Sequence, residues 1–131
     1  MRRIKYVLVF LLMGMVGNLS AQITFFQGTF EEALKKAKAE KKEVFVDFYT
    51  EWCGPCKGMS QKVFTVPEVG DYFNTHFVSC KLNAEALEQA ELVKKYGVEA
   101  FPTMIFVNVK GEVLRVVRGA KAPAALLNEA K

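Results

Sequence analysis

The sequence predicts one α/β domain with a mixed central sheet flanked by helices. Helical and strand-like patterns alternate along the chain from residue 30 onward. The strand candidates are short and rich in β-branched and aromatic residues. A hydrophobic fraction of 51% over 131 residues is ordinary for one compact core. With three cysteines, this composition excludes a disordered chain, a collagen, a coiled coil and a disulfide-dense miniprotein.

The first 21 residues have the pattern of a secretory signal peptide. Three basic residues precede an apolar run over residues 6–16, and a short polar stretch then ends at Ala21. This apolar run is shorter than the roughly 20 residues that cross a bilayer core. We therefore expect residues 1–21 to act as an export signal and residues 22–131 to form the domain.

Cleavage after Ala21 places Leu19 where signal peptidases prefer a small residue, so an uncleaved N-terminal anchor is the alternative. Either form predicts that the domain faces an exported, oxidising compartment, the periplasm of a bacterium.

The formal net charge of +4 comes mostly from this leader. Residues 1–21 hold three of the 18 basic residues and no acidic one, which leaves 15 basic against 14 acidic residues in the domain. A nearly neutral domain gives no reason to expect a nucleic-acid partner.

The elements are justified in chain order by periodicity and by their flanking residues. Thr29 can cap a helix over 30–39, whose first turn carries two acids. The run 44–49 is apolar on both faces except for one acid, which predicts a buried strand. A turn at 50–58 should open a helix to about residue 65, followed by a helical segment from Pro67 and a strand at 77–82. A helix is expected at 86–96, with Leu87 on its apolar side and Gly97 at its end. Strands at 103–107 and 112–117 are joined across 108–111, and a last helix covers 122–130 with Pro123 in its first turn.

Two cysteines three residues apart follow the predicted strand at 44–49 and open the predicted helix after it. Cysteines on one helical turn can form a disulfide with little backbone movement. Free backbone N–H groups at the start of the helix stabilise a thiolate on the first cysteine. We therefore expect Cys53 to be the nucleophile and Cys56, one turn deeper, to be the resolving thiol.

The resolving step requires a base, because Cys56 must lose a proton while buried. Asp47 is the only charged residue in an otherwise apolar strand, and burial should raise its pKa towards the working range. The alternative is a strand-end carboxylate that faces solvent.

At these residues the sequence resembles the thioredoxin family. The motif over 46–57 matches the family's strand, buried acid and redox motif in register, and 96–103 resembles the segment that carries its cis-proline. Residues 111–113 and 118–120 resemble the last hairpin and the glycine after it. The resemblance implies a thioredoxin fold over 22–131, catalytic roles for Cys53, Cys56, Asp47 and Lys81, and a substrate-binding surface made of Trp52, Gly54, Pro55, Phe101, Pro102 and Gly119.

Several of these residues have simpler interpretations. Lys81 could be a solvated lysine, and Pro102 an ordinary trans proline at the start of a strand. Cys80 is expected to be a core residue rather than a third redox thiol. Gln61 stands where family members usually have a proline, and this stretch looks closer to exported thioredoxin-like domains.

The resemblance implies a thiol-disulfide oxidoreductase, and Gly-Pro between the cysteines is the dipeptide of the reducing members. We expect reduction of disulfides in exported proteins, with electrons supplied by a membrane donor of the thiol:disulfide interchange type. The chain is expected to be a monomer and to need no cofactor and no metal.

Other functions stay open at this stage. A non-catalytic thioredoxin-fold binding module, a disulfide isomerase and an oxidase are the alternatives. A metal-binding module is disfavoured, because a structural zinc site needs four ligands and no second paired motif accompanies the two cysteines.

Overall fold

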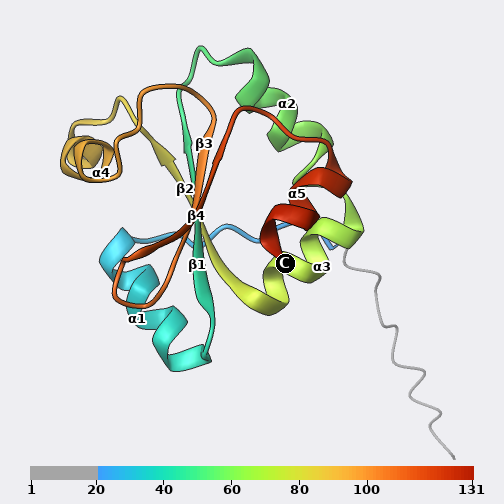
Figure 1. The fold of residues 1–131 in the computed structure, drawn as a ribbon, viewed down its shortest axis with the longest axis horizontal. Coiled ribbons are helices and arrows are strands. Elements are labelled where there is room, and N and C mark those ends of the chain that lie inside the picture. The colour runs from blue at the N-terminus through green and yellow to red at the C-terminus, as the bar shows by residue number, and fades with distance from the viewer. Residues whose placement is uncertain (1–20) are drawn as a thin grey trace, which may run out of the picture.

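The computed structural model describes residues 21–131, which form a four-stranded mixed sheet with helices on both faces (Figure 1). The strands are β1 (Glu43–Tyr49), β2 (Phe77–Asn83), β3 (Thr103–Val107) and β4 (Val113–Arg118), and they lie in the order β2-β1-β3-β4. β1 pairs with β2 in parallel and with β3 antiparallel, and β3 pairs with β4 antiparallel. The predicted α/β class with a mixed sheet is confirmed.

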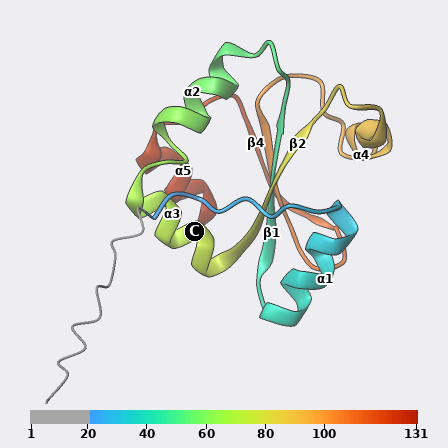
Figure 2. The same cartoon turned by 180° about the vertical axis from the view of Figure 1, so that it is seen from behind.

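The helices divide between the two faces of the sheet (Figures 1 and 2). α2, α3 and α5 cover one face, and α1 and α4 lie on the other. Their bounds are α1 (Phe30–Glu40), α2 (Gly54–Lys62), α3 (Pro67–His76), the short 3-10 turn η1 (Leu87–Gln89), α4 (Ala90–Lys95) and α5 (Pro123–Ala130).

Local capping explains where the first helices begin and end. The Thr29 hydroxyl accepts the Glu32 N–H and the Glu32 carboxylate accepts the Thr29 N–H, which is a complete capping box at the start of α1. Lys41 ends α1 in the left-handed conformation, with φ 57°. α2 begins directly after Cys53, so both cysteines lie just beyond the carboxyl end of β1, an inner strand of the sheet.

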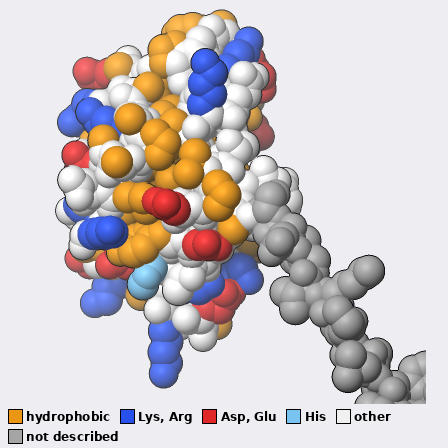
Figure 3. All heavy atoms as spheres, turned by 90° about the vertical axis from the view of Figure 1, so that its right-hand side faces the viewer, with side chains coloured by type: hydrophobic (Ala, Val, Ile, Leu, Met, Phe, Trp, Pro, Cys, Tyr) orange, Lys and Arg blue, Asp and Glu red, His pale blue; other side chains and the backbone are white. Residues whose placement is uncertain are grey.

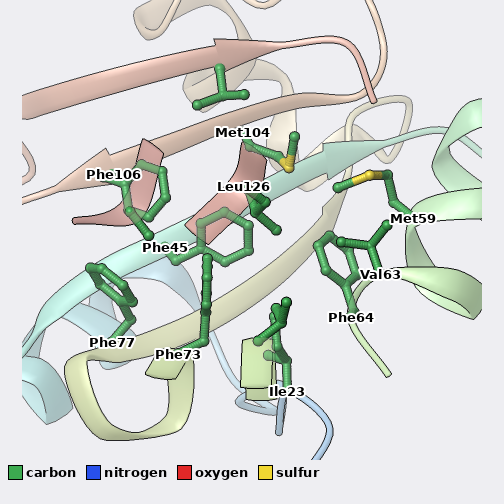
Figure 4. Packing of buried hydrophobic residues seen from close by; sticks show 13 residues of the cluster. Ile23, Phe45, Met59, Val63, Phe64, Phe73, Phe77, Met104, Phe106 and Leu126 are labelled. Carbon is green, nitrogen blue, oxygen red and sulfur yellow. The ribbon is translucent and has the colours of Figure 1, made fainter. Parts of the chain in front are cut away.

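The core on the α2, α3 and α5 face is rich in aromatic rings. Figure 4 shows Phe45 and Phe106 of the sheet packed with Phe73 of α3 and with Leu126 of α5. The Phe45 and Phe73 ring centroids lie 4.8 Å apart in an edge-to-face arrangement. Met59 of α2 belongs to the same cluster, so this core also fixes α2, whose start carries the cysteine pair, against the sheet.

The region after β2 differs from its prediction. A continuous helix was expected over 86–96, but η1 precedes an α4 of only six residues. Leu87, expected on the apolar side, is 89% exposed. Ala86 has extended backbone angles and no side chain caps the start of η1, so this segment begins as a loose turn.

The N-terminal segment, defined here as residues 21–26, lies across α3 and along the free edge of β2. Ile23 is buried and its N–H donates to the Phe64 carbonyl at 2.9 Å. Phe25 forms a parallel bridge with Ser79, and the Phe26 N–H donates to the Ser79 carbonyl at 2.8 Å. This segment therefore behaves as a minimal edge strand.

The signal peptide expected at residues 1–21 lies outside the described residues, apart from its last residue. Within residues 21–131, none of the helices combines the length and the apolar character that crossing a membrane requires.

Candidate active site

The two cysteines of the motif form a disulfide at the start of α2. Cys53 is the N-cap residue of α2, and its Sγ accepts the backbone N–H of Cys56 at 3.1 Å. The two Cα atoms are 5.3 Å apart, a normal spacing for a disulfide. A thiolate on Cys53 would accept that same N–H and would lie at the positive end of the helix dipole, so this position favours the charged form.

The structure separates the two cysteines by environment rather than by exposure. Both residues are 2% exposed, whereas the sequence predicted that Cys56 would be the less accessible one. Cys56 lines a cavity of about 160 Å³ that opens between the end of β1 and α2, and Cys53 does not. The cavity gives Cys56 a route to water from the side of the molecule where Lys81 lies.

Asp47 is fully buried in the middle of β1, at 0% exposure. Neither of its carboxylate oxygens has a hydrogen-bond partner among the described residues. Burial raises the pKa of Asp47 to about 7, and the nearby Lys81 charge opposes part of that rise. The predicted burial of this acid and the predicted direction of its pKa shift are both found in the structure.

Lys81 lies directly beside Asp47 in the sheet. The two residues are Cα partners in the parallel register of β1 and β2. The Lys81 side chain is half-buried and donates a hydrogen bond to the Ser60 hydroxyl of α2. The alternative of a freely solvated lysine therefore does not describe its position.

The structure brings four of the predicted substrate-binding residues together in two pairs, Trp52 with Phe101 and Pro102 with Gly119. Trp52 is 68% exposed, and its ring meets the half-buried Phe101 ring edge-on at 6.0 Å. The Phe101–Pro102 peptide bond is cis. The Gly119 N–H donates to the Pro102 carbonyl at 2.9 Å, and Gly119 has a φ of 85° that favours glycine. Gly54 and Pro55, in the first turn of α2, are exposed.

Sequence reasoning missed the partners of two site residues. The Trp52 indole N–H donates a hydrogen bond to the Glu85 carboxylate in the loop after β2. The Ser60 hydroxyl accepts a hydrogen bond from the Lys81 ammonium. Glu85 is 33 residues from Trp52, and Ser60 is 21 residues from Lys81. Gln61 marks this part of α2 as unusual for the family, but no local pattern indicates the Ser60 contact.

Cys80 is buried in β2 at 2% exposure and forms no disulfide. Burial raises the pKa of its thiol to about 12, so at neutral pH it stays protonated and unreactive. This agrees with the prediction of a core residue. Within residues 21–131, no cluster of three or more His, Cys, Asp or Glu side chains could hold a metal ion.

A mixed sheet with a Cys-Gly-Pro-Cys disulfide at a helix start, directly after a strand that contains a buried acid, defines a thiol-disulfide oxidoreductase. The family model of the thioredoxin-like domain matches residues 30–131. The chain belongs to the thioredoxin family.

Known relatives agree with this assignment. The chain is similar to a thioredoxin of Streptomyces clavuligerus, with 37% identity over 99 residues that cover 76% of this chain and 83% of the relative. It is also similar to a solved structure from Bacteroides thetaiotaomicron that is provisionally assigned as a disulphide-isomerase, with 49% identity, a TM-score of 0.76, and coverage of 84% and 91%. A third likeness is to the C-terminal domain of Neisseria meningitidis DsbD, with 25% identity, a TM-score of 0.64, and coverage of 80% and 95%.

Proposed function

We propose that this protein reduces disulfides in exported proteins, with Cys53 as the attacking thiolate and Cys56 as the resolving thiol. The observation that carries the proposal is the place of the pair: Cys53 Sγ sits at the start of α2 and accepts the Cys56 N–H. Cys56 lines a cavity together with Lys81, which is the register partner of the buried Asp47. The first cysteine is thereby prepared to be a thiolate, and the second to lose a proton.

The reaction balances as a two-electron exchange. The Cys53 thiolate attacks one sulfur of a substrate disulfide, that S–S bond breaks, and the other substrate sulfur leaves as a thiolate that takes a proton from water. Asp47 then accepts the Cys56 proton. The Cys56 thiolate attacks Cys53 Sγ, which forms the disulfide seen in the structure and releases the second substrate sulfur. The enzyme loses two electrons and the substrate disulfide gains them.

Substrate recognition in this scheme uses the surface around Trp52, Phe101 and Gly119. The exposed Trp52 ring offers a hydrophobic contact beside the disulfide. The Phe101 backbone, just before Pro102, can pair with an extended substrate segment in the manner of an added strand. Such pairing uses backbone groups, so it tolerates many substrate sequences.

The exported location and the electron donor are part of the proposal. The leader pattern of residues 1–21 supports export of the domain. We propose the bacterial periplasm as the compartment. A reductant in an oxidising compartment must be recharged from outside that compartment, which supports a membrane donor of the thiol:disulfide interchange type. The likeness to the DsbD C-terminal domain supports a place in such an electron chain.

Trapping tests the substrates and the donor together. In Cys56→Ser the mixed disulfide on Cys53 cannot be resolved, so exported proteins and a membrane protein are expected to accumulate as covalent complexes. Cys53→Ser is the matched control and should trap nothing. If Cys56→Ser expressed with its leader captures no exported protein, the proposed role is wrong.

A disulfide isomerase is the second candidate, and the 49% identity to the Bacteroides structure favours it. An isomerase must refold a protein with scrambled disulfides without net reduction. Reactivation of scrambled ribonuclease in a glutathione buffer measures this activity. A rate well above that of Cys53→Ser would support isomerisation.

A further inference from the structure

The ammonium group of Lys81 lies within a cage of aromatic rings. Its Nζ is 5.1 Å from the ring centroid of Tyr49, 5.8 Å from that of Phe25 and 6.0 Å from that of Phe64. Cations are attracted to ring faces at these separations. Ser60 adds a hydrogen bond to the same ammonium. These four residues, Phe25, Tyr49, Phe64 and Ser60, are called the Lys81 cage below.

The cage matters because Lys81 and Asp47 interact without a direct contact. The residues are partners in the β1–β2 register, yet among residues 21–131 no ion pair within 4 Å joins their charged groups. The ammonium therefore acts on the buried carboxylate through its field, whose strength depends on its distance. A flexible, strongly hydrated ammonium left free would turn outward to water.

Other titratable groups also face this region. Tyr49 of β1, Glu51 in the turn after it and Lys57 of α2 line the same cavity as Cys56 and Lys81. Burial, reinforced by the Glu51 and Asp47 charges, raises the pKa of the Tyr49 hydroxyl, which is therefore neutral near pH 7. Cys56 does not titrate while it is disulfide-bonded, and Glu51 and Lys57 carry opposite charges. Lys81 is therefore the cation that acts most directly on Asp47.

One wall of the cage comes from the N-terminal segment. Phe25 is held in place by its bridge to Ser79 and by the Asn74 side chain on α3. The Asn74 amide donates to the Gln22 carbonyl, and its oxygen accepts the Thr24 N–H, both at 2.9 Å. The segment next to the leader is therefore in contact with the lysine of the active site.

We propose that the Lys81 cage is a positioning device, which holds the Lys81 ammonium close to Asp47 for the step in which Cys56 is deprotonated. In this role the four residues of the cage act through Lys81 and do not take part in the bond changes. The proposal rests on the dithiol exchange set out above, and it assigns to the N-terminal segment a part in the chemistry.

The test is the titration midpoint of the Asp47 carboxyl carbon, followed by NMR in the oxidised full-length protein. Lys81→Met removes the cation and should raise the midpoint by about one pH unit. Phe25→Leu removes one ring and should raise it by about half a unit. Phe25→Tyr keeps a ring and should restore the wild-type midpoint.

Phe26→Leu is the matched control within the same segment. Phe26 packs against the hydrophobic cluster on the opposite face of the sheet, the face that α1 covers, and lies outside the cage. Its replacement should therefore leave the midpoint at the wild-type value. Ser60→Ala removes the hydrogen bond without disturbing the N-terminal segment and should shift the midpoint in the same direction as Phe25→Leu.

A Phe25→Leu or Ser60→Ala midpoint equal to that of the wild type would overturn the proposal, as would an unshifted Lys81→Met. The titration uses the oxidised protein and needs no substrate, so it does not depend on the direction of electron flow. A failure of the reductase proposal would appear in the redox potential and in trapping, and would leave this midpoint series unchanged.

Discussion

In the proposed mechanism Asp47 is the base that deprotonates Cys56, and its burial costs the fold stability. The carboxyl is fully buried, lacks hydrogen-bond partners among the described residues, and has a pKa raised to about 7. A base whose pKa lies near the working pH is efficient, because it is part ionised and still accepts a proton well. The same burial makes the ionised form expensive inside the protein.

Asp47→Asn should slow the release of substrate from Cys53 by on the order of 10²-fold, because the Cys56 proton then has no internal acceptor. The first attack by Cys53 does not use Asp47 and should change little. Stopped-flow measurement of mixed-disulfide formation and decay with a small disulfide substrate separates the two steps. Equal slowing of both steps would contradict this role.

The stability of the protein should fall as pH rises from about 4 to about 7. The pKa of Asp47 rises from an ordinary value of 3.8 in the unfolded chain to about 7 in the fold, so between these values the folded state binds more protons than the unfolded state. The cost of ionising this carboxyl in the fold therefore grows through this window, to about 4 kcal/mol, and stays constant above it.

Asp47→Asn should remove this dependence and be more stable than wild type at about pH 8, by up to about 4 kcal/mol, with little difference at about pH 4. Denaturant unfolding at both pH values measures it. A wild type that gains stability between these pH values, relative to Asp47→Asn, would refute the sign.

Among the residues of the site, the sequence predicts those that stand out from their neighbours in the chain. Asp47 is evident because it interrupts an apolar strand, and the cysteines because they open a helix. The partners of Trp52 and Lys81 are set by tertiary contacts over 33 and 21 residues, and a single sequence carries no local pattern for such contacts.

At the scale of elements, the close approach of the N-terminal segment to α3 depends on Gly70. A Cβ at this position would lie 2.7 Å from the carbonyl carbon of Gln22, which stays in the domain after cleavage at Ala21, and in the uncleaved chain it would also lie 1.5 Å from the Ala21 carbonyl oxygen. These are backbone atoms, which cannot move without undocking the segment. A glycine inside a helix normally costs stability, so its presence here is explained by this crossing.

Gly70→Ala should therefore lower the free energy of unfolding by about 2 kcal/mol, through overpacking at the crossing. Gly58→Ala in α2 is the matched control, because a Cβ there meets nothing within 4 Å. It should raise the free energy of unfolding by about 1 kcal/mol through helix propensity alone. Denaturant unfolding of both variants gives the comparison, and two stabilised proteins would show that the segment does not cross α3 closely.

The sequence predicts the bounds of the strands better than those of the helix after β2. Strands were predicted to within one residue, because buried β-branched runs and turn residues mark both ends. The prediction of a helix over 86–96 was wrong for its first turn. No side chain caps the start of this segment, and Leu87 faces water. Helical spacing of apolar residues alone does not reveal either feature.

At the scale of the whole molecule, one face of the sheet supports the cysteine pair. The face of α2, α3 and α5 holds the aromatic core that fixes the cysteine-bearing helix, and hydrophobic side chains remain visible across its surface (Figure 3). The N-terminal segment crosses this side at α3 and reaches the Lys81 cage. Sequence composition predicts one compact domain of this size but not this link between the N-terminal segment and the active site.

The proposed activity requires that the cysteine pair be a reductant. The backbone N–H of Cys56 can stabilise a Cys53 thiolate. Gly54 and Pro55 have no charged or hydrogen-bonding side chain, so neither adds to that stabilisation. A less stabilised thiolate makes the dithiol the stronger electron donor.

The equilibrium redox potential of the Cys53–Cys56 pair, measured against glutathione or dithiothreitol buffers, tests this most directly. We predict a value near that of thioredoxin, roughly −270 mV. A value near roughly −120 mV, that of the strong oxidant DsbA, would contradict the reducing role.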